Sequence, residues 1–138
     1  MLHTSTWNEI KELLRVKGLL VDKKPVIDVI LSDMAHKFTG HRTADHARVE
    51  ELCEKALRVA HMSLKPGGSF VCKVLRPCDG TSFFLVLFLT IVLEFKSTLE
   101  KSFDRVIFEK PQSSRQESSE GYLIGLKFRK PTSSPPLL

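Results

Sequence analysis

The chain has 138 residues, enough for one domain with a single hydrophobic core. Its 21 Lys and Arg residues outnumber its 16 Asp and Glu residues and give a net charge of +5, which is compatible with a polyanionic partner. The three cysteines include no C-x-x-C pair, which argues against a disulfide framework and favours reduced thiols inside a cell.

The first half of the chain predicts a helix, a buried strand and a second helix. Residues 6–16 have apolar side chains at helical spacing, and we expect this helix to cover one side of a sheet. Residues 26–31 form an apolar run interrupted only by Asp28, which is typical of a central parallel strand. After a polar connector, residues 44–64 keep helical spacing up to the breakers Pro66, Gly67 and Gly68.

The second half predicts three more strands. They cover residues 69–75, 105–109 and 122–128, with a short helical segment at 96–102. Gly67 and Gly68 follow a predicted helix and precede a predicted strand, so we interpret them as a turn of the scaffold. The alternation of strands and helices predicts an α/β fold with a doubly wound sheet. Residues 130–138 are rich in Pro and Ser and are expected to form a disordered tail.

Residues 83–93 form an apolar stretch in which Thr90 is the one polar residue. Eleven residues make about 16 Å of helix, roughly half of what a bilayer core requires, so we expect no stable membrane insertion. Three interpretations stay open. The stretch is a buried helix or extra strand, a sequence foreign to the original fold, or an element that binds a membrane surface or a partner.

Three charged residues lie at or near the ends of predicted strands. Asp33 follows the first apolar run, Lys73 interrupts the second, and Glu120 precedes the last. Burying each charge alone would be costly, so their placement on neighbouring strands suggests that they meet. Open α/β sheets bind ligands at the carboxyl ends of their strands, which makes this a candidate site. The alternative is an ion cluster without chemistry.

Four motifs resemble, in their order and their amino-acid sequence, those of the FtsJ-type RNA 2'-O-ribose methyltransferases. They are Leu31-Ser-Asp-Met-Ala35, Thr39-Gly40, Leu64-Lys-Pro-Gly-Gly-Ser-Phe-Val-Cys-Lys-Val74 and Lys110-Pro-Gln-Ser-Ser-Arg-Gln-Glu-Ser-Ser-Glu-Gly-Tyr122. The resemblance covers roughly residues 26–127. It implies a partial Rossmann-like fold for S-adenosylmethionine-dependent methyl transfer, with a mostly parallel sheet whose last strand is antiparallel.

The resemblance also implies roles for individual residues. The family uses a Lys-Asp-Lys-Glu tetrad with S-adenosylmethionine, and Asp33, Lys73 and Glu120 match its last three members. Lys73 would be the base, Asp33 would orient it and lie near the methyl donor as a cofactor-binding residue, and Glu120 would hold the lysine or the ribose hydroxyl. The first lysine has no counterpart here, which favours a fully charged Lys73 and a poorer base.

The family's Gly-rich cofactor loop and the acidic residue after its second strand are not present in this sequence. We therefore expect residues 1–129 to be the C-terminal portion of such a domain, with an atypical apolar insert at about 76–95. Arg42, Arg76 and Arg115 fall in connectors near the strands' carboxyl ends and are candidate RNA-phosphate contacts, with solvated surface charges as the alternative.

The function that follows from the resemblance is S-adenosylmethionine-dependent 2'-O-methylation of a ribose in ribosomal RNA, expected in the large subunit. The partner would be ribosomal RNA or a pre-ribosomal particle. The alternatives are a catalytically inactive RNA-binding or scaffold fragment, or a mis-spliced product without a stable fold. The sequences of the motifs resemble those of the bacterial and mitochondrial branch of the family. We therefore expect a mitochondrial location, with the cytoplasm or nucleus as alternatives.

Three histidines raise the question of a metal site. His36, His41 and His46 recur every five residues, which does not place them on one helix face, and neighbouring Cys and acidic residues lack zinc-like spacing. We therefore expect no metal.

Overall fold

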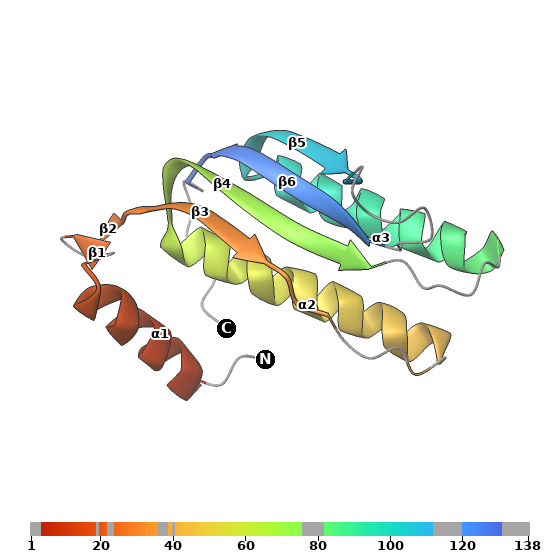
Figure 1. Ribbon diagram of the computed structural model, residues 1–138, viewed down its shortest axis with the longest axis horizontal. Coiled ribbons are helices and arrows are strands. Elements are labelled where there is room, and N and C mark those ends of the chain that lie inside the picture. Colours follow the sequence, from red (N-terminus) through yellow and green to blue (C-terminus); the bar gives the residue numbers. More distant parts are fainter. Residues whose placement is uncertain are drawn as a thin grey trace.

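The computed structural model of the chain has a mixed sheet with helices packed against one of its faces (Figure 1). It describes residues 4–18, 20–21, 24–35, 39, 41–75, 82–111 and 120–130. Within these ranges the elements in chain order are α1 (Thr4–Val16), β1 (Leu20–Val21), β2 (Lys24–Pro25), β3 (Ile27–Ser32), α2 (Arg42–Ser63), β4 (Leu64–Leu75), α3 (Ser82–Glu100), β5 (Phe103–Glu109) and β6 (Glu120–Phe128).

The larger sheet confirms the predicted α/β fold class. Within the described residues it has four strands in the order β3-β4-β6-β5. Strand β3 runs parallel to β4, whereas β6 is antiparallel to both β4 and β5. Strands β3, β4 and β5 therefore share one direction, and the last strand runs against them. Strands β1 and β2 pair as a small separate antiparallel ladder that the sequence did not predict.

The core lies between the sheet and the helices α2 and α3. In β4, Phe70, Cys72 and Val74 alternate with more exposed residues and are buried on one face of the sheet. Helix α2 packs on β4, α3 packs on β5 and β6, and the two helices touch each other. Both helices therefore cover the same face (Figure 1). The alternation leaves Lys73 on the opposite face.

The opposite face of the sheet is more open. Val29 and Leu31 of β3 are 51% and 73% exposed. We expected the first helix to cover a sheet face, but α1 instead contacts β1 and lies apart from the larger sheet (Figure 1). Leu13 and Val16 of α1 are accordingly exposed. The helix was predicted correctly, but its expected packing was wrong for the described part of the chain.

The apolar stretch at 83–93 belongs to α3, and the short helix predicted at 96–102 corresponds to the last turns of the same helix. One side of α3 is buried in the core, which confirms the buried-helix alternative for that side. The buried residues are Phe88, Ile91, Val92, Phe95 and Leu99. The other side exposes Leu85, Val86, Leu89 and Leu93. Among the described helices, none is long and apolar enough to cross a membrane.

Gly67 and Gly68 lie inside β4, not in a turn before it. The pairing with β3 shifts here, since Ile27 faces Leu64 whereas Val29 faces Ser69. Gly67 has a φ of 81°, and a Cβ on Gly68 would lie 3.0 Å from the Asp28 carbonyl oxygen. The two glycines thus allow an irregularity in β4 that brings its backbone close to β3.

Candidate functional site

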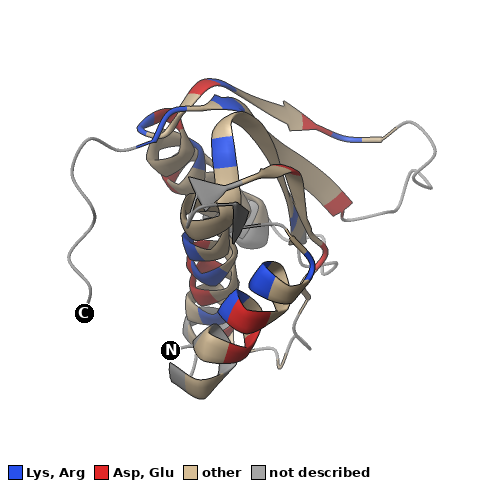
Figure 2. Cartoon of the chain, turned by 90° about the vertical axis from the view of Figure 1, so that its left-hand side faces the viewer, with Lys and Arg blue, Asp and Glu red and all other residues tan. Residues whose placement is uncertain are grey.

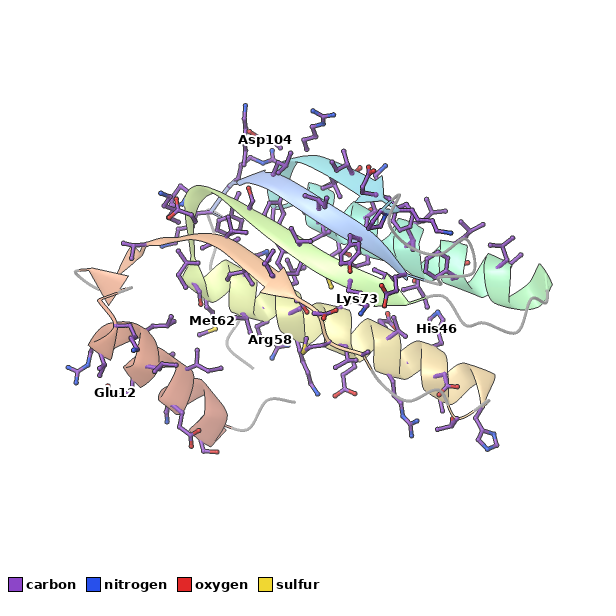
Figure 3. All side chains as sticks on the ribbon, in the orientation of Figure 1. Glu12, His46, Arg58, Met62, Lys73 and Asp104 are labelled. Atoms are coloured by element: carbon purple, nitrogen blue, oxygen red, sulfur yellow. The ribbon has the colours of Figure 1, made fainter. Side chains whose placement is uncertain are left out.

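Lys73 is the centre of a charged cluster at one edge of the sheet. Its Nζ lies 2.8 Å from Oδ1 of Asp33 and 3.0 Å from Oε1 of Glu120. The Lys73 side chain is 14% exposed, whereas those of Asp33 and Glu120 are 77% and 39% exposed. The structure therefore brings together all three residues that the sequence singled out, and Figure 3 shows Lys73 near the carboxyl end of β4.

Strand pairing explains why these residues meet. Ser32 is the Cα partner of Cys72 in the parallel ladder, so Asp33 and Lys73 both follow the same rung. Strand β6 runs the other way and starts with Glu120, which is the partner of Leu75. Glu120 therefore lies diagonally across from Lys73 on the same face of the sheet. The site therefore lies where the parallel strands β3 and β4 end and the antiparallel strand β6 begins.

The cluster keeps Lys73 charged. The hydrogen bond with Asp33, followed by that with Glu120, raises the pKa of the Lys73 ammonium above its ordinary value, and the opposing effect of burial is smaller. A lysine acts as a general base only when its amine is neutral. In this arrangement Lys73 is therefore an ion-paired cation, as the lack of a second nearby lysine led us to expect.

A small cavity adjoins the cluster between the ends of β3 and β4 and helix α2. Its volume is about 10 Å³, and it is lined by Ser32, Met34, Ala35, Val49, Leu52, Cys53, Cys72 and Lys73. This is room for about one water molecule, whereas pockets for drug-sized ligands measure roughly 300–1,000 Å³. This cavity does not fit S-adenosylmethionine. Asp33 is the one residue of this chain that we predicted to contact the cofactor.

The connector after β3 is tied to α2 by a contact that the sequence did not reveal. The Thr39 backbone N–H lies 3.1 Å and 3.0 Å from the two carboxylate oxygens of Asp45, and the Thr39 hydroxyl donates to Oδ1 at 2.9 Å. Asp45 is 4% exposed and lies in the first turn of α2, where a carboxylate is favoured by the helix dipole. An acidic residue in the first turn of a predicted helix was the sequence feature that could have pointed to this contact. The contact holds Thr39 beside the first turn of α2.

The predicted RNA contacts remain predictions. Arg42 is the first residue of α2, but its side chain is outside the description, as are Arg76 and Arg115 altogether. Figure 2 shows Lys and Arg segments interleaved with Asp and Glu segments along the helices, without sorting by sign. His41 and His46 are described, His36 is not, and no group of three His, Cys, Asp or Glu residues among the described residues could hold a metal ion.

Comparisons with known proteins agree with the motifs. The family model described as FtsJ-like methyltransferase matches residues 2–128. The chain is 46% identical to Ribosomal RNA large subunit methyltransferase E of Anaplasma marginale over 120 residues, covering 87% of this chain and 52% of that protein. It is 38% identical to the protein of the same name from Ehrlichia ruminantium over 108 residues, covering 78% of this chain and 74% of that protein.

A solved structure shares the fold. The crystal structure of a ribosomal RNA methyltransferase from Plasmodium falciparum superposes with a TM-score of 0.57 at 28% identity, covering 83% of this chain and 52% of that one. The chain thus spans about half the length of this structure and of the Anaplasma marginale protein. The family match extends over almost all of the chain and includes the three clustered residues. The chain therefore belongs to the FtsJ-like methyltransferase family.

Proposed function

We propose that this chain contributes the Lys73 cluster to an enzyme that methylates a ribose 2'-hydroxyl in large-subunit ribosomal RNA, with S-adenosylmethionine as methyl donor. The observation that carries the proposal is the convergence of Asp33, Lys73 and Glu120 at the carboxyl ends of two parallel strands. An ion cluster serving stability alone would not need to lie at the edge where such folds bind ligands.

The roles of the three residues follow from their exposure and charge. Lys73 is the least exposed of them and is held by both carboxylates, so its ammonium has a fixed position from which to contact a ribose hydroxyl. Removing the hydroxyl proton requires a neutral amine. An arriving RNA that displaces one carboxylate would lower the pKa of Lys73 toward that requirement. Asp33 and Glu120 orient the lysine until then.

The methyl donor would be held mainly by residues that this chain does not supply. Members of the family are generally dependent on S-adenosylmethionine, and we propose the same donor for this protein. The cavity beside Lys73 is water-sized, and Asp33, with its carboxylate largely exposed, is the residue we propose to face the donor. The chain spans about half the length of the Anaplasma marginale relative, and its sequence has no Gly-rich cofactor loop.

A mitochondrial location is part of the proposal. The two similar proteins named Ribosomal RNA large subunit methyltransferase E come from bacteria, which supports a ribosomal RNA substrate of the bacterial type. Co-sedimentation of the protein with mitochondrial large ribosomal subunits would support the location. Recovery from the cytosol or nucleus alone would contradict it.

The test of the function is to map ribose methylation in cells in which the gene is disrupted. We expect one large-subunit ribosomal RNA ribose to lose its 2'-O-methyl group and become cleavable by alkali at that position. The wild-type gene and a Lys65→Ala version should restore the methyl group, whereas Lys73→Ala should not. Unchanged methylation after disruption, or full restoration by Lys73→Ala, would contradict the proposal.

A further inference from the structure

Two cysteines meet in the core beside the site. The sulfur atoms of Cys53 on α2 and Cys72 on β4 lie 4.0 Å apart. Both residues are buried, with 3% and 2% of their surfaces exposed, and both are free thiols. Neither thiol has a role in the proposed methyl transfer. Their proximity results from the packing of α2 on β4.

Both thiols border a small cavity near the site. Both cysteines line the cavity of about 10 Å³ that also touches Lys73. The same cavity is lined by Met34 and Ala35, which are exposed residues of the segment after β3. A small displacement of that segment would admit a molecule slightly larger than water. Entry of a peroxide therefore requires only this local movement, with the sheet intact.

The contact between the two sulfurs affects the pKa of both thiols. The hydrogen bond with Cys53, and a weaker one with Ser32, lowers the pKa of the Cys72 thiol, although burial acts in the opposite direction. The hydrogen bond with Cys72, together with burial, raises the pKa of Cys53. Because the sulfurs lie 4.0 Å apart, a thiol that is oxidised has the other thiol beside it as a resolving cysteine.

We propose that Cys53 and Cys72 form a modification site that a peroxide oxidises to a reversible disulfide. The Cys72 sulfur attacks one oxygen of hydrogen peroxide, the O–O bond breaks, and a sulfenic acid and one water form. The Cys53 sulfur then attacks the sulfenic sulfur and displaces the second water. Two thiols and one peroxide thereby give one disulfide and two waters, with two electrons passing from sulfur to oxygen.

The bond would change the structure next to Lys73. It requires the sulfur atoms to close from 4.0 Å to about 2.05 Å, so the two side chains have to rotate and α2 has to follow any remaining movement toward β4. The bond would link α2 to β4 one residue before Lys73, whose carbonyl oxygen already lies 3.6 Å from the Cys72 sulfur. The cross-link would also close the chain between the two cysteines and restrict the unfolded state.

The test uses the full chain with Cys78→Ser, which leaves two cysteines of the three in the sequence. Hydrogen peroxide should remove both thiols together, lower the mass by about 2 Da and give one peptide that links residues 53 and 72, all reversed by a dithiol reductant. The oxidised chain should unfold several degrees above the reduced chain. Because folding holds the sulfurs together, disulfide formation should be at least about tenfold faster in buffer than in concentrated urea.

Matched variants separate this modification from general oxidation. Cys53→Ala with Cys78→Ser keeps Cys72 without its partner, and should gain oxygen in place of losing two hydrogens. Cys72→Val with Cys78→Ser preserves an apolar side chain on β4. Peroxide should not raise the unfolding temperature of either variant. Separate oxidation of the two thiols to sulfinic acids, disulfides only between chains, or faster disulfide formation in urea would each overturn the proposal.

Discussion

Asp33 and Lys73 come from neighbouring parallel strands, and their charged atoms lie 2.8 Å apart. Asp33 follows Ser32 and Lys73 follows Cys72, and Ser32 and Cys72 are paired in the parallel ladder. The strand pairing therefore sets the distance between Asp33 and Lys73. Lys73 is largely buried and Asp33 largely exposed, which means that solvent or a ligand reaches the carboxylate before it reaches the ammonium. The pair is therefore open toward one side, where a substrate would enter.

The first prediction concerns stability at high pH. Because the pKa of Lys73 is raised in the folded chain, its ion cluster contributes fully below the unfolded-state pKa of about 10.4, and this contribution is lost as pH rises through the folded-state pKa. The free energy of unfolding, measured with urea between about pH 10 and about pH 12, should therefore fall more steeply for the wild type than for Lys73→Met. Equal slopes would mean that the cluster does not stabilise the fold.

The second prediction concerns the packing of Phe103 on Gly125. A Cβ on Gly125 would lie 2.7 Å from Cγ of Phe103, whose ring is buried with 1% of the residue exposed. Gly125→Ala should therefore lower the free energy of unfolding by about 1–3 kcal/mol, because the ring has to move within a packed core. The control is Ser97→Ala on the exposed side of α3, expected within about 0.5 kcal/mol of the wild type. Equal stability of both variants would contradict this packing.

The third prediction concerns the contact between Thr39 and Asp45. Asp45→Ala should lower the free energy of unfolding by about 1–3 kcal/mol, because it removes the acceptor of three hydrogen-bond contacts from Thr39. Thr39→Val alone removes the hydroxyl and should cost less. In the double variant the two losses should not add, since each disrupts the same contact. Full additivity in chemical denaturation would show that the two residues act separately.

The fourth prediction concerns association of the 138-residue chain by itself. Leu89 and Leu93 of α3 are 47% and 63% exposed, and among the described strands β3 pairs only with β4, leaving one edge open. Light scattering should therefore detect oligomers or aggregates, and changing both leucines to Gln should reduce them. The same chain should show weak or no heat of binding with S-adenosylmethionine. A monodisperse monomer with saturable micromolar cofactor binding would contradict both expectations.

The strands and the charged cluster could be predicted because their signals are local. The apolar run before Asp33 specifies the position of a strand, and the alternation around Lys73 specifies both a strand and its faces. The run also predicted a central strand, which was wrong, because β3 lies at an edge of the described sheet. Once these strands are neighbours in one sheet, the charged residues at their ends must meet. Boundaries were less accurate: β4 begins at Leu64, earlier than predicted, because residues around Gly67 pair irregularly with β3.

The features that were missed depend on tertiary packing. Helix α3 is apolar on nearly every side over residues 83–93, so the pattern has no helical period and left a strand possible. The contact between Cys53 and Cys72 is set by how α2 lies on β4, and the Asp45 contact by where Thr39 lies beside α2. The packing of α1 could not be predicted from its amphipathic pattern, because the pattern identifies an apolar face but not the element that this face contacts.

The most direct test of the central claim is tritium transfer from labelled S-adenosylmethionine to ribosomal RNA by the longest natural form of the protein. Lys73→Ala should reduce transfer by about 100-fold or more, because the hydroxyl proton loses its acceptor. The matched control is Lys65→Ala, since Lys65 lies at the other end of β4 and pairs with Asp28. It should stay within about twofold of the wild type. Transfer by Lys73→Ala at the control's rate would contradict the assignment of the cluster as the site of methyl transfer.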